Sequence, residues 1–115
     1  MSKDGNCIAD IRRERHAMVV QLAGEVDMHH APAVHKGLLT LCDEKPPRLV
    51  LNLEKVSYMD SSGIGTLVAT LRRIHGYGGR LALCCMQEQV RNVFEITRLD
   101  KVFLICATET EAISG

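Results

Sequence analysis

Short apolar segments recur along the chain, separated by polar or glycine-containing stretches. Some alternate apolar and polar residues, as half-buried strands do, and others are almost continuously apolar, as in strands covered on both faces. A charged stretch at residues 12–15 (RRER) joins the first two segments, so we expect an antiparallel hairpin at the start of the fold. The expected strands cover residues 7–12, 17–23, 48–53, 81–86 and 102–106.

Between these segments, apolar residues recur at intervals of three and four, which is helical spacing. Pro32 suits the first turn of the first such segment, and a glycine-rich stretch at residues 76–79 ends the second. Strand and helix alternate after the hairpin, so the expected fold is α/β, a mixed β-sheet of about five strands with helices packed against it. The expected helices cover residues 31–42, 64–74, 87–97 and 109–113.

Asp60-Ser61-Ser62-Gly63 lies where the third strand gives way to a helix, and it is the most informative stretch of the sequence. The first turn of a helix has backbone N–H groups without partners and the positive end of the helix dipole, so a phosphate there is stabilised. Ser61 and Ser62 are therefore candidate phosphorylation sites. The alternative is that these residues serve only as helix caps, since serine, aspartate and glycine are all favoured there.

Composition narrows the classes of function. With 115 residues, 46% of them apolar and 3% aromatic, the chain suits one domain with an aliphatic core. The 14 basic and 14 acidic residues balance, so we expect no nucleic-acid partner. No apolar run is long enough to span a bilayer, and residues 1–6 (MSKDGN) lack a signal-peptide core. These features predict a cytoplasmic protein with no membrane partner.

Known catalytic and metal-binding patterns do not fit the sequence. Met59 stands where a nucleophile elbow needs its first glycine, and Val68 stands at the third glycine position of a dinucleotide-binding turn. The five cysteines form no C-x-x-C pair, so they are expected to be buried thiols and not zinc ligands. Asp27 and Asp60 each follow a strand and could approach one another, but we interpret them as recognition or capping groups. We therefore expect no catalytic residues, no metal and no cofactor.

Several longer stretches resemble the STAS-domain anti-sigma factor antagonists, small bacterial regulators, and the resemblance covers nearly the whole of residues 1–115 as one STAS domain. The most specific block is residues 49–65 (LVLNLEKVSYMDSSGIG), which holds the family's Met-Asp-Ser-Ser-Gly phosphorylation motif. Further matching blocks are residues 22–27 (LAGEVD), 78–83 (GGRLAL) and 90–99 (VRNVFEITRL).

The resemblance implies a function. Ser61 would be phosphorylated by an anti-sigma factor that is itself a serine kinase using ATP and magnesium. The unphosphorylated form would bind that kinase and free a sigma factor, and a metal-dependent serine phosphatase would restore it. Asp27 matches an acidic position near the phosphorylated serine, and Ser62 matches a capping serine beside it. Asp27, Asp60, Ser62, Gly63 and Ile64 are thus expected to surround the switch and contact the partner.

Two positions depart from the family's pattern. His30 replaces a helix-capping threonine, and Arg98 replaces a glycine before Leu99. The resemblance also leaves a second function open, because STAS domains serve as unswitched subunits of transport or stress-signalling complexes. An enzyme built on Asp27, Asp60 and Ser61 is a third hypothesis, which the missing nucleophile elbow and missing base make poor.

Overall fold

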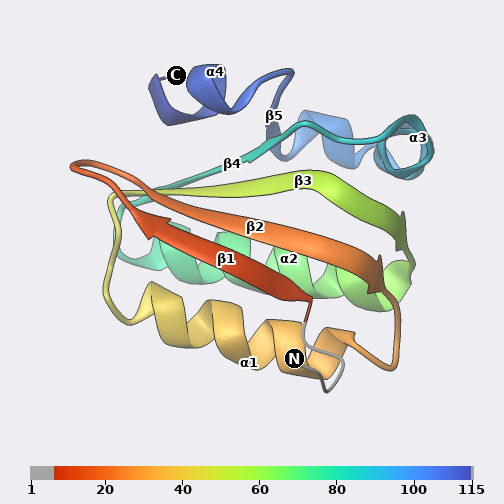
Figure 1. The fold of residues 1–115 in the computed structure, drawn as a ribbon, viewed down its shortest axis with the longest axis horizontal. Helices are drawn as coiled ribbons and strands as arrows, with labels where there is room; N and C mark the ends of the chain where they lie inside the picture. Colours follow the sequence, from red (N-terminus) through yellow and green to blue (C-terminus); the bar gives the residue numbers. More distant parts are fainter. Residues whose placement is uncertain (1–6, 115) are drawn as a thin grey trace.

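The computed structural model describes residues 7–114, so residues 1–6 and 115, including the stretch inspected for a signal peptide, lie outside the described residues. Five strands form one sheet in the order β1-β2-β3-β4-β5 (Figure 1). β1 and β2 pair antiparallel, and every later pair is parallel, which confirms the mixed α/β sheet and its N-terminal hairpin. The strands are β1 (Ile8–Arg13), β2 (Met18–Val26), β3 (Arg48–Met59), β4 (Arg80–Cys84) and β5 (Leu104–Cys106).

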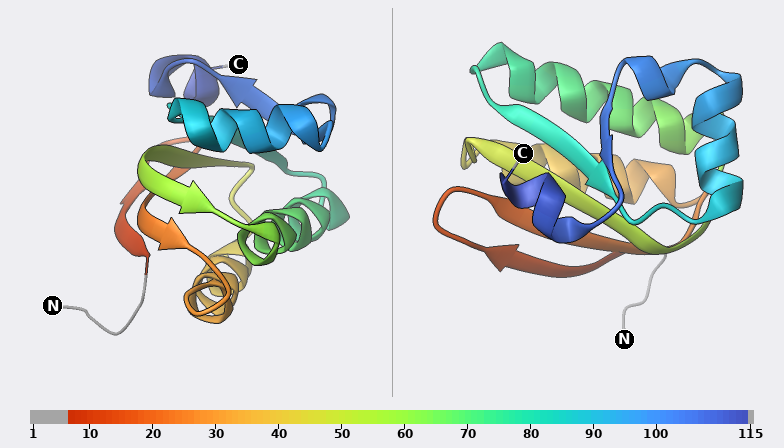
Figure 2. Two further views of the ribbon diagram at one scale, coloured as in Figure 1. Left: turned by 90° about the vertical axis from the view of Figure 1, so that its right-hand side faces the viewer. Right: turned by 90° about the horizontal axis from the view of Figure 1, so that it is seen from above.

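Helices cover both faces of this sheet. α1 and α2 lie side by side on one face, and α4 lies over β3 and β4 on the other (Figures 1 and 2). α3 is tied to the second half of β3, where Gln87 Nε2 donates to the carbonyl oxygen of Glu54 at 2.9 Å. The helices are α1 (Ala31–Cys42), α2 (Ser61–Gly76), α3 (Glu88–Ile96) and α4 (Glu109–Ser114), with a 3₁₀ turn, η1 (Leu99–Lys101), before β5.

The main core lies between the sheet and the α1–α2 layer. Leu22, Leu51 and Leu83 come from the three central strands and are fully buried there. Phe94 of α3 meets Phe103 edge-on, with ring centroids 5.6 Å apart. The aliphatic contacts of the core hold the ends of β2 and β3 in a fixed position relative to the two helices that follow them.

β3 is longer than expected, because it continues past Leu53 to Met59. In this second half only every third residue, Leu53, Val56 and Met59, is buried. The register against β2 shifts twice, between Gln21 and Ala23 and between Gly24 and Glu25. Each shift is a local irregularity that changes which face the next side chain takes, so the regular alternation of a strand is lost. The extension brings Asp60 level with the end of β2.

The boundaries of other elements differ from expectation too: β2 continues to Val26, and α2 covers Ser61–Gly76. The last strand begins at Leu104 and not at residue 102, because residues 99–101 form η1 and the N–H of Phe103 donates to the carbonyl of Leu99 at 3.0 Å. β4 ends at Cys84, and Cys85 follows with φ of 63°. Arg98 has φ of 65°, the left-handed conformation that favours glycine, which explains the glycine of the family pattern at this turn.

Candidate functional site

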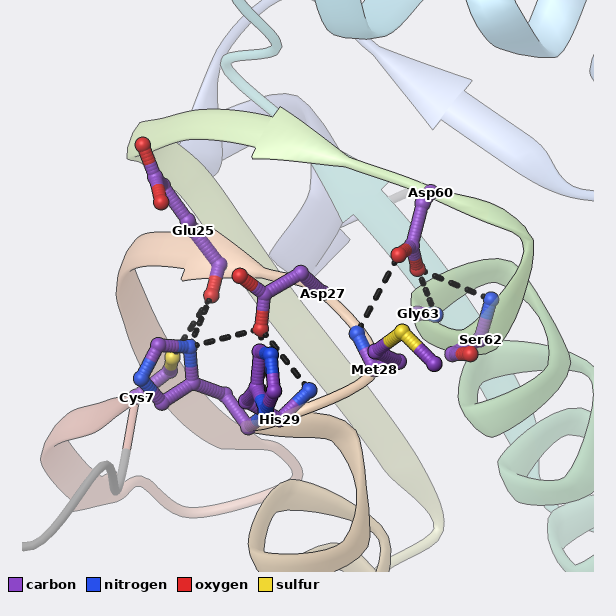
Figure 3. Close-up of polar contacts among 9 residues, drawn as sticks. Cys7, Glu25, Asp27, Met28, His29, Asp60, Ser62 and Gly63 are labelled. Carbon is purple, nitrogen blue, oxygen red and sulfur yellow. Dashed lines mark hydrogen bonds and ion pairs between the residues drawn. The ribbon is translucent and has the colours of Figure 1, made fainter.

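The candidate site lies where two neighbouring parallel strands end. Val26 and Met59 are register partners at the ends of β2 and β3, and Asp27 and Asp60 follow them directly. The N–H of Asp60 donates to the carbonyl of Val26 at 3.4 Å, so the two strands separate only at this point. A helix follows each strand, α1 after β2 and α2 after β3. Both helix N-termini therefore face the same edge of the sheet (Figure 3).

Asp60 connects the two segments that leave these strands. It is the N-cap of α2, and its Oδ1 accepts hydrogen bonds from the N–H groups of Ser62 at 2.9 Å and Gly63 at 3.1 Å. Its Oδ2 accepts a hydrogen bond from the N–H of Met28 at 3.1 Å (Figure 3). One carboxylate thus caps α2 and fixes the turn before α1 against it.

This geometry corrects the role expected for Ser62. The N-cap is Asp60, and Ser62 lies inside the first turn, where its backbone N–H donates to that cap. Asp60 reaches the cap position because its backbone is extended, with φ of −103° and ψ of −170°, so its side chain turns back over the helix end. The Ser62 hydroxyl is therefore not needed as a capping group.

Asp27 organises the turn before α1. Its Oδ1 accepts hydrogen bonds from the N–H groups of His29 at 3.0 Å and His30 at 3.1 Å, and lies 2.9 Å from His30 Nδ1. His30 itself makes no side-chain cap bond, so Asp27 supplies the acceptor that the histidine does not. The same imidazole nitrogen lies 2.8 Å from the carbonyl oxygen of Glu25. Both aspartates therefore hold the turn before α1, Asp27 from within the turn and Asp60 from the start of α2.

The contacts of Asp27 also change its ionisation. Desolvation opposes the charged form, but the backbone N–H groups of His30 and His29 and the nearby imidazoles favour it. Together they hold the pKa of Asp27 below its ordinary value of 3.8. Asp27 is thus an anion at neutral pH.

A pH series on an Asp27→Asn variant tests this. Because the pKa of Asp27 is lowered in the folded state, its carboxylate stabilises the fold above pH 3.8. This contribution disappears as the pH falls through the folded pKa. We expect wild type to be more stable than Asp27→Asn near pH 6, with the gap closing as the pH falls below 3.8 and through the folded pKa. Urea unfolding of both proteins across this range measures it, and a gap independent of pH would contradict the assignment.

Gly63 is the tightest position of the site. A Cβ built there would lie 2.4 Å from the carbonyl oxygen of Val26 and 2.7 Å from Cγ of Met59. α2 therefore starts in direct contact with the ends of both strands, and only glycine permits this approach. The glycine of the motif has a packing role that is independent of any chemistry at the serines.

The remaining site residues face outward. Ser61 is the first residue of α2 and is exposed, while Ile64 is half-buried one turn later. The sequence did not single out Met28, which is 66% exposed and whose N–H is held by Asp60. No local signal could have found it, since single exposed apolar side chains are common on protein surfaces.

Neither a cluster of metal-binding side chains nor a membrane-spanning helix is found in the part of the chain that is described. No group of three or more His, Cys, Asp or Glu side chains among residues 7–114 is arranged to hold a metal ion. Within the same residues, every helix is too short or too polar to cross a bilayer.

Known proteins share this sequence and fold. A family model described as STAS domain matches residues 9–112. The anti-sigma-B factor antagonist of Bacillus subtilis (strain 168) is 34% identical over 102 residues, which cover 89% of this chain and 93% of that protein. SpoIIAA, an anti-sigma factor antagonist solved in its unphosphorylated form, is 28% identical with a TM-score of 0.69, covering 91% of this chain and 94% of its own.

A protein of the same name has also been solved in another state. The Bacillus cell fate determinant SpoIIAA in its phosphorylated form is 29% identical with a TM-score of 0.69, covering 91% of this chain and 96% of its own. The family model and the Bacillus subtilis relative both span most of the sequence described above. The chain therefore belongs to the STAS-domain family of anti-sigma factor antagonists.

Proposed function

We propose that this protein is a phosphorylation-controlled anti-sigma factor antagonist of the bacterial cytoplasm. Unphosphorylated, it binds an anti-sigma factor serine kinase and thereby frees a sigma factor for transcription. Phosphorylation of Ser61 by that kinase ends the interaction, and a metal-dependent serine phosphatase restores it. The protein is a substrate and a binding partner, not an enzyme. The observation that carries the proposal is the exposed Ser61 at the first position of α2, directly after the fixed carboxylate of Asp60.

The geometry favours a switch that acts through surface charge. A phosphate adds about −1.5 to −2 charges at neutral pH. Asp60 already occupies the N–H groups of Ser62 and Gly63, which would otherwise be donors for a phosphate at this helix end. The added charge therefore stays at the surface, near the Asp60 carboxylate, and the fold has no new internal contact to make. A partner surface shaped for a neutral hydroxyl would reject it by repulsion and desolvation.

The relatives support the same reading. The Bacillus subtilis and SpoIIAA proteins are named as antagonists of anti-sigma factors, and SpoIIAA has been solved with and without phosphorylation. This chain aligns with SpoIIAA over 91% of its length. Ser61 follows the aspartate of the family's motif. Ile64 comes one turn later on α2, and Asp27 follows β2, the strand that pairs with the end of β3.

Variants of Ser61 test the proposal. Ser61→Ala protein, used as bait in its native cells, is expected to retain the kinase, which mass spectrometry identifies by its ATP-binding domain. With the purified kinase, Ser61→Ala should bind like wild type, and Ser61→Asp at least about tenfold more weakly, equal to about 1.4 kcal/mol. Incubation with the kinase, ATP and magnesium should add one phosphoryl group to wild type and none to Ser61→Ala.

Ser62→Ala is the matched control, because Ser62 is the next residue of the same helix turn and is not the helix cap. It should bind and be phosphorylated like wild type. Equal affinity of Ser61→Ala and Ser61→Asp would refute the switch and favour an unswitched STAS subunit. Phosphorylation of the Ser61→Ala protein at Ser62 would show that Ser62, and not Ser61, is the phosphorylated residue.

A further inference from the structure

A groove of about 660 Å³ runs between α1 and α2, on the side of these helices away from the sheet. Its apolar part is formed by Leu39 of α1 and by Val68 and Ala69 of α2, all of them half-buried. The two helices lie side by side along this length (Figure 2). Their facing surfaces therefore leave an apolar strip that the protein's own described residues do not cover.

The charged residues of the groove have one sign. His35, Arg72 and Arg73 are its titratable lining residues, and none of its described lining residues is acidic. The guanidinium of Arg73 is bound to Asp43 beside the groove, whereas Arg72 is exposed and makes no ion pair within residues 7–114. The groove thus combines an apolar strip with a cation that no described residue pairs. It is complementary to an acidic, amphipathic surface.

The groove is continuous with the candidate switch. Gly65 lines it and lies four residues after Ser61 on α2, so the two positions are neighbours on the same helix face. Gly65 is exposed and has no protein atom within 4 Å of a Cβ built on it. The absent side chain leaves one end of the groove open to the backbone of an approaching element, one turn from the serine hydroxyl.

We propose that this groove binds an amphipathic helix of the anti-sigma factor kinase. The apolar side of that helix packs on Leu39, Val68 and Ala69, and an acidic side chain pairs with Arg72. A helix fits because the groove is an open channel between two helices, where ridges of side chains pack into such grooves. The inference rests on the proposed function and adds to it the second contact by which the partner is held.

Substitution of Gly65 separates binding from folding. Gly65→Leu adds a side chain to the groove without meeting any protein atom at its Cβ, and it replaces a poor helix former by a good one. We expect its melting temperature to stay equal to or above that of wild type, while its affinity for the purified kinase falls at least about tenfold. Gly76→Leu, on the same helix but outside the groove and equally unobstructed, is the control and should bind like wild type.

Charge reversal tests the second feature. Arg72→Glu should weaken binding of the kinase, with a larger effect at low ionic strength, because it places an anion against the acidic partner helix. Lys36→Glu is its control, since Lys36 is an exposed cation of α1 outside the groove. Amide hydrogen exchange of the wild-type complex should show protection over residues 35–39 and 65–73.

The outcomes separate this inference from the proposed function. Loss of binding in Ser61→Asp with wild-type binding in Gly65→Leu and Arg72→Glu would overturn the groove site and leave the switch intact. Loss in the two groove variants with equal binding of the Ser61 variants would support the groove and refute the switch. A wild-type dimer in light scattering that Gly65→Leu converts to monomer would overturn the proposal, because a second copy of this chain would then be the occupant.

Discussion

Replacing Gly63 with alanine is expected to lower the free energy of unfolding by about 3 kcal/mol, at the upper end of the usual range for overpacking. The added methyl group would lie 2.4 Å from the backbone oxygen of Val26 and 2.7 Å from Cγ of Met59. The methionine side chain can rotate, but a backbone oxygen inside a paired strand cannot move without breaking its register. Relief therefore requires the start of α2 to shift away from the sheet.

Gly65→Ala is the matched control for this experiment. Both glycines lie in the first turns of α2, but Gly65 is exposed and has no atom within 4 Å of a new Cβ. Alanine at Gly65 should raise stability by up to about 1 kcal/mol, the usual difference between the two residues inside a helix. Urea unfolding measures both changes, and a Gly63→Ala protein as stable as wild type would disprove the close contact between α2 and the end of β2.

How far the sequence predicts this fold depends on how regular each segment is. The hairpin, the later parallel strands and the amphipathic α2 follow simple periodicities, and the expected mixed sheet is confirmed. The second half of β3 does not follow the two-residue alternation of a strand, because two irregularities in its pairing with β2 leave only every third side chain buried. Such shifts depend on a partner strand some thirty residues away, so local pattern cannot reveal them.

The site shows the same limit. The Asp60-Ser61-Ser62-Gly63 motif lies at the start of α2, as expected. That Ser61 is the phosphorylated residue remains a prediction. The assignment of the cap to Ser62 was wrong, since aspartate and serine are equally good caps and only the backbone conformation decides between them. The contact between Asp60 and the N–H of Met28 joins segments far apart in sequence, and no local signal predicts it.

That contact gives Asp60 a larger role than a cap alone. Asp60→Ala should lower the free energy of unfolding by about 2–3 kcal/mol. Loss of a helix cap costs about 1–2 kcal/mol. The lost hydrogen bond from Met28 to the carboxylate adds about 1.5 kcal/mol, and less where water replaces the carboxylate. The variant leaves the N–H groups of Ser62, Gly63 and Met28 without their acceptor. Ser61 would then begin a frayed helix, so binding of the kinase should weaken as well.

Asp60→Ser distinguishes the two roles of this carboxylate. A serine hydroxyl can cap α2, but its single oxygen has two acceptor lone pairs, and the N–H groups of Ser62 and Gly63 occupy both. No acceptor is then left for the N–H of Met28. We expect about half of the lost stability to return, while the Met28 amide exchanges with solvent as rapidly as in Asp60→Ala. Hydrogen exchange measured residue by residue tests this. If Asp60→Ser restored the protection of Met28 in full, the turn before α1 would be held by Asp27 and its own backbone, and Asp60 would be a helix cap only.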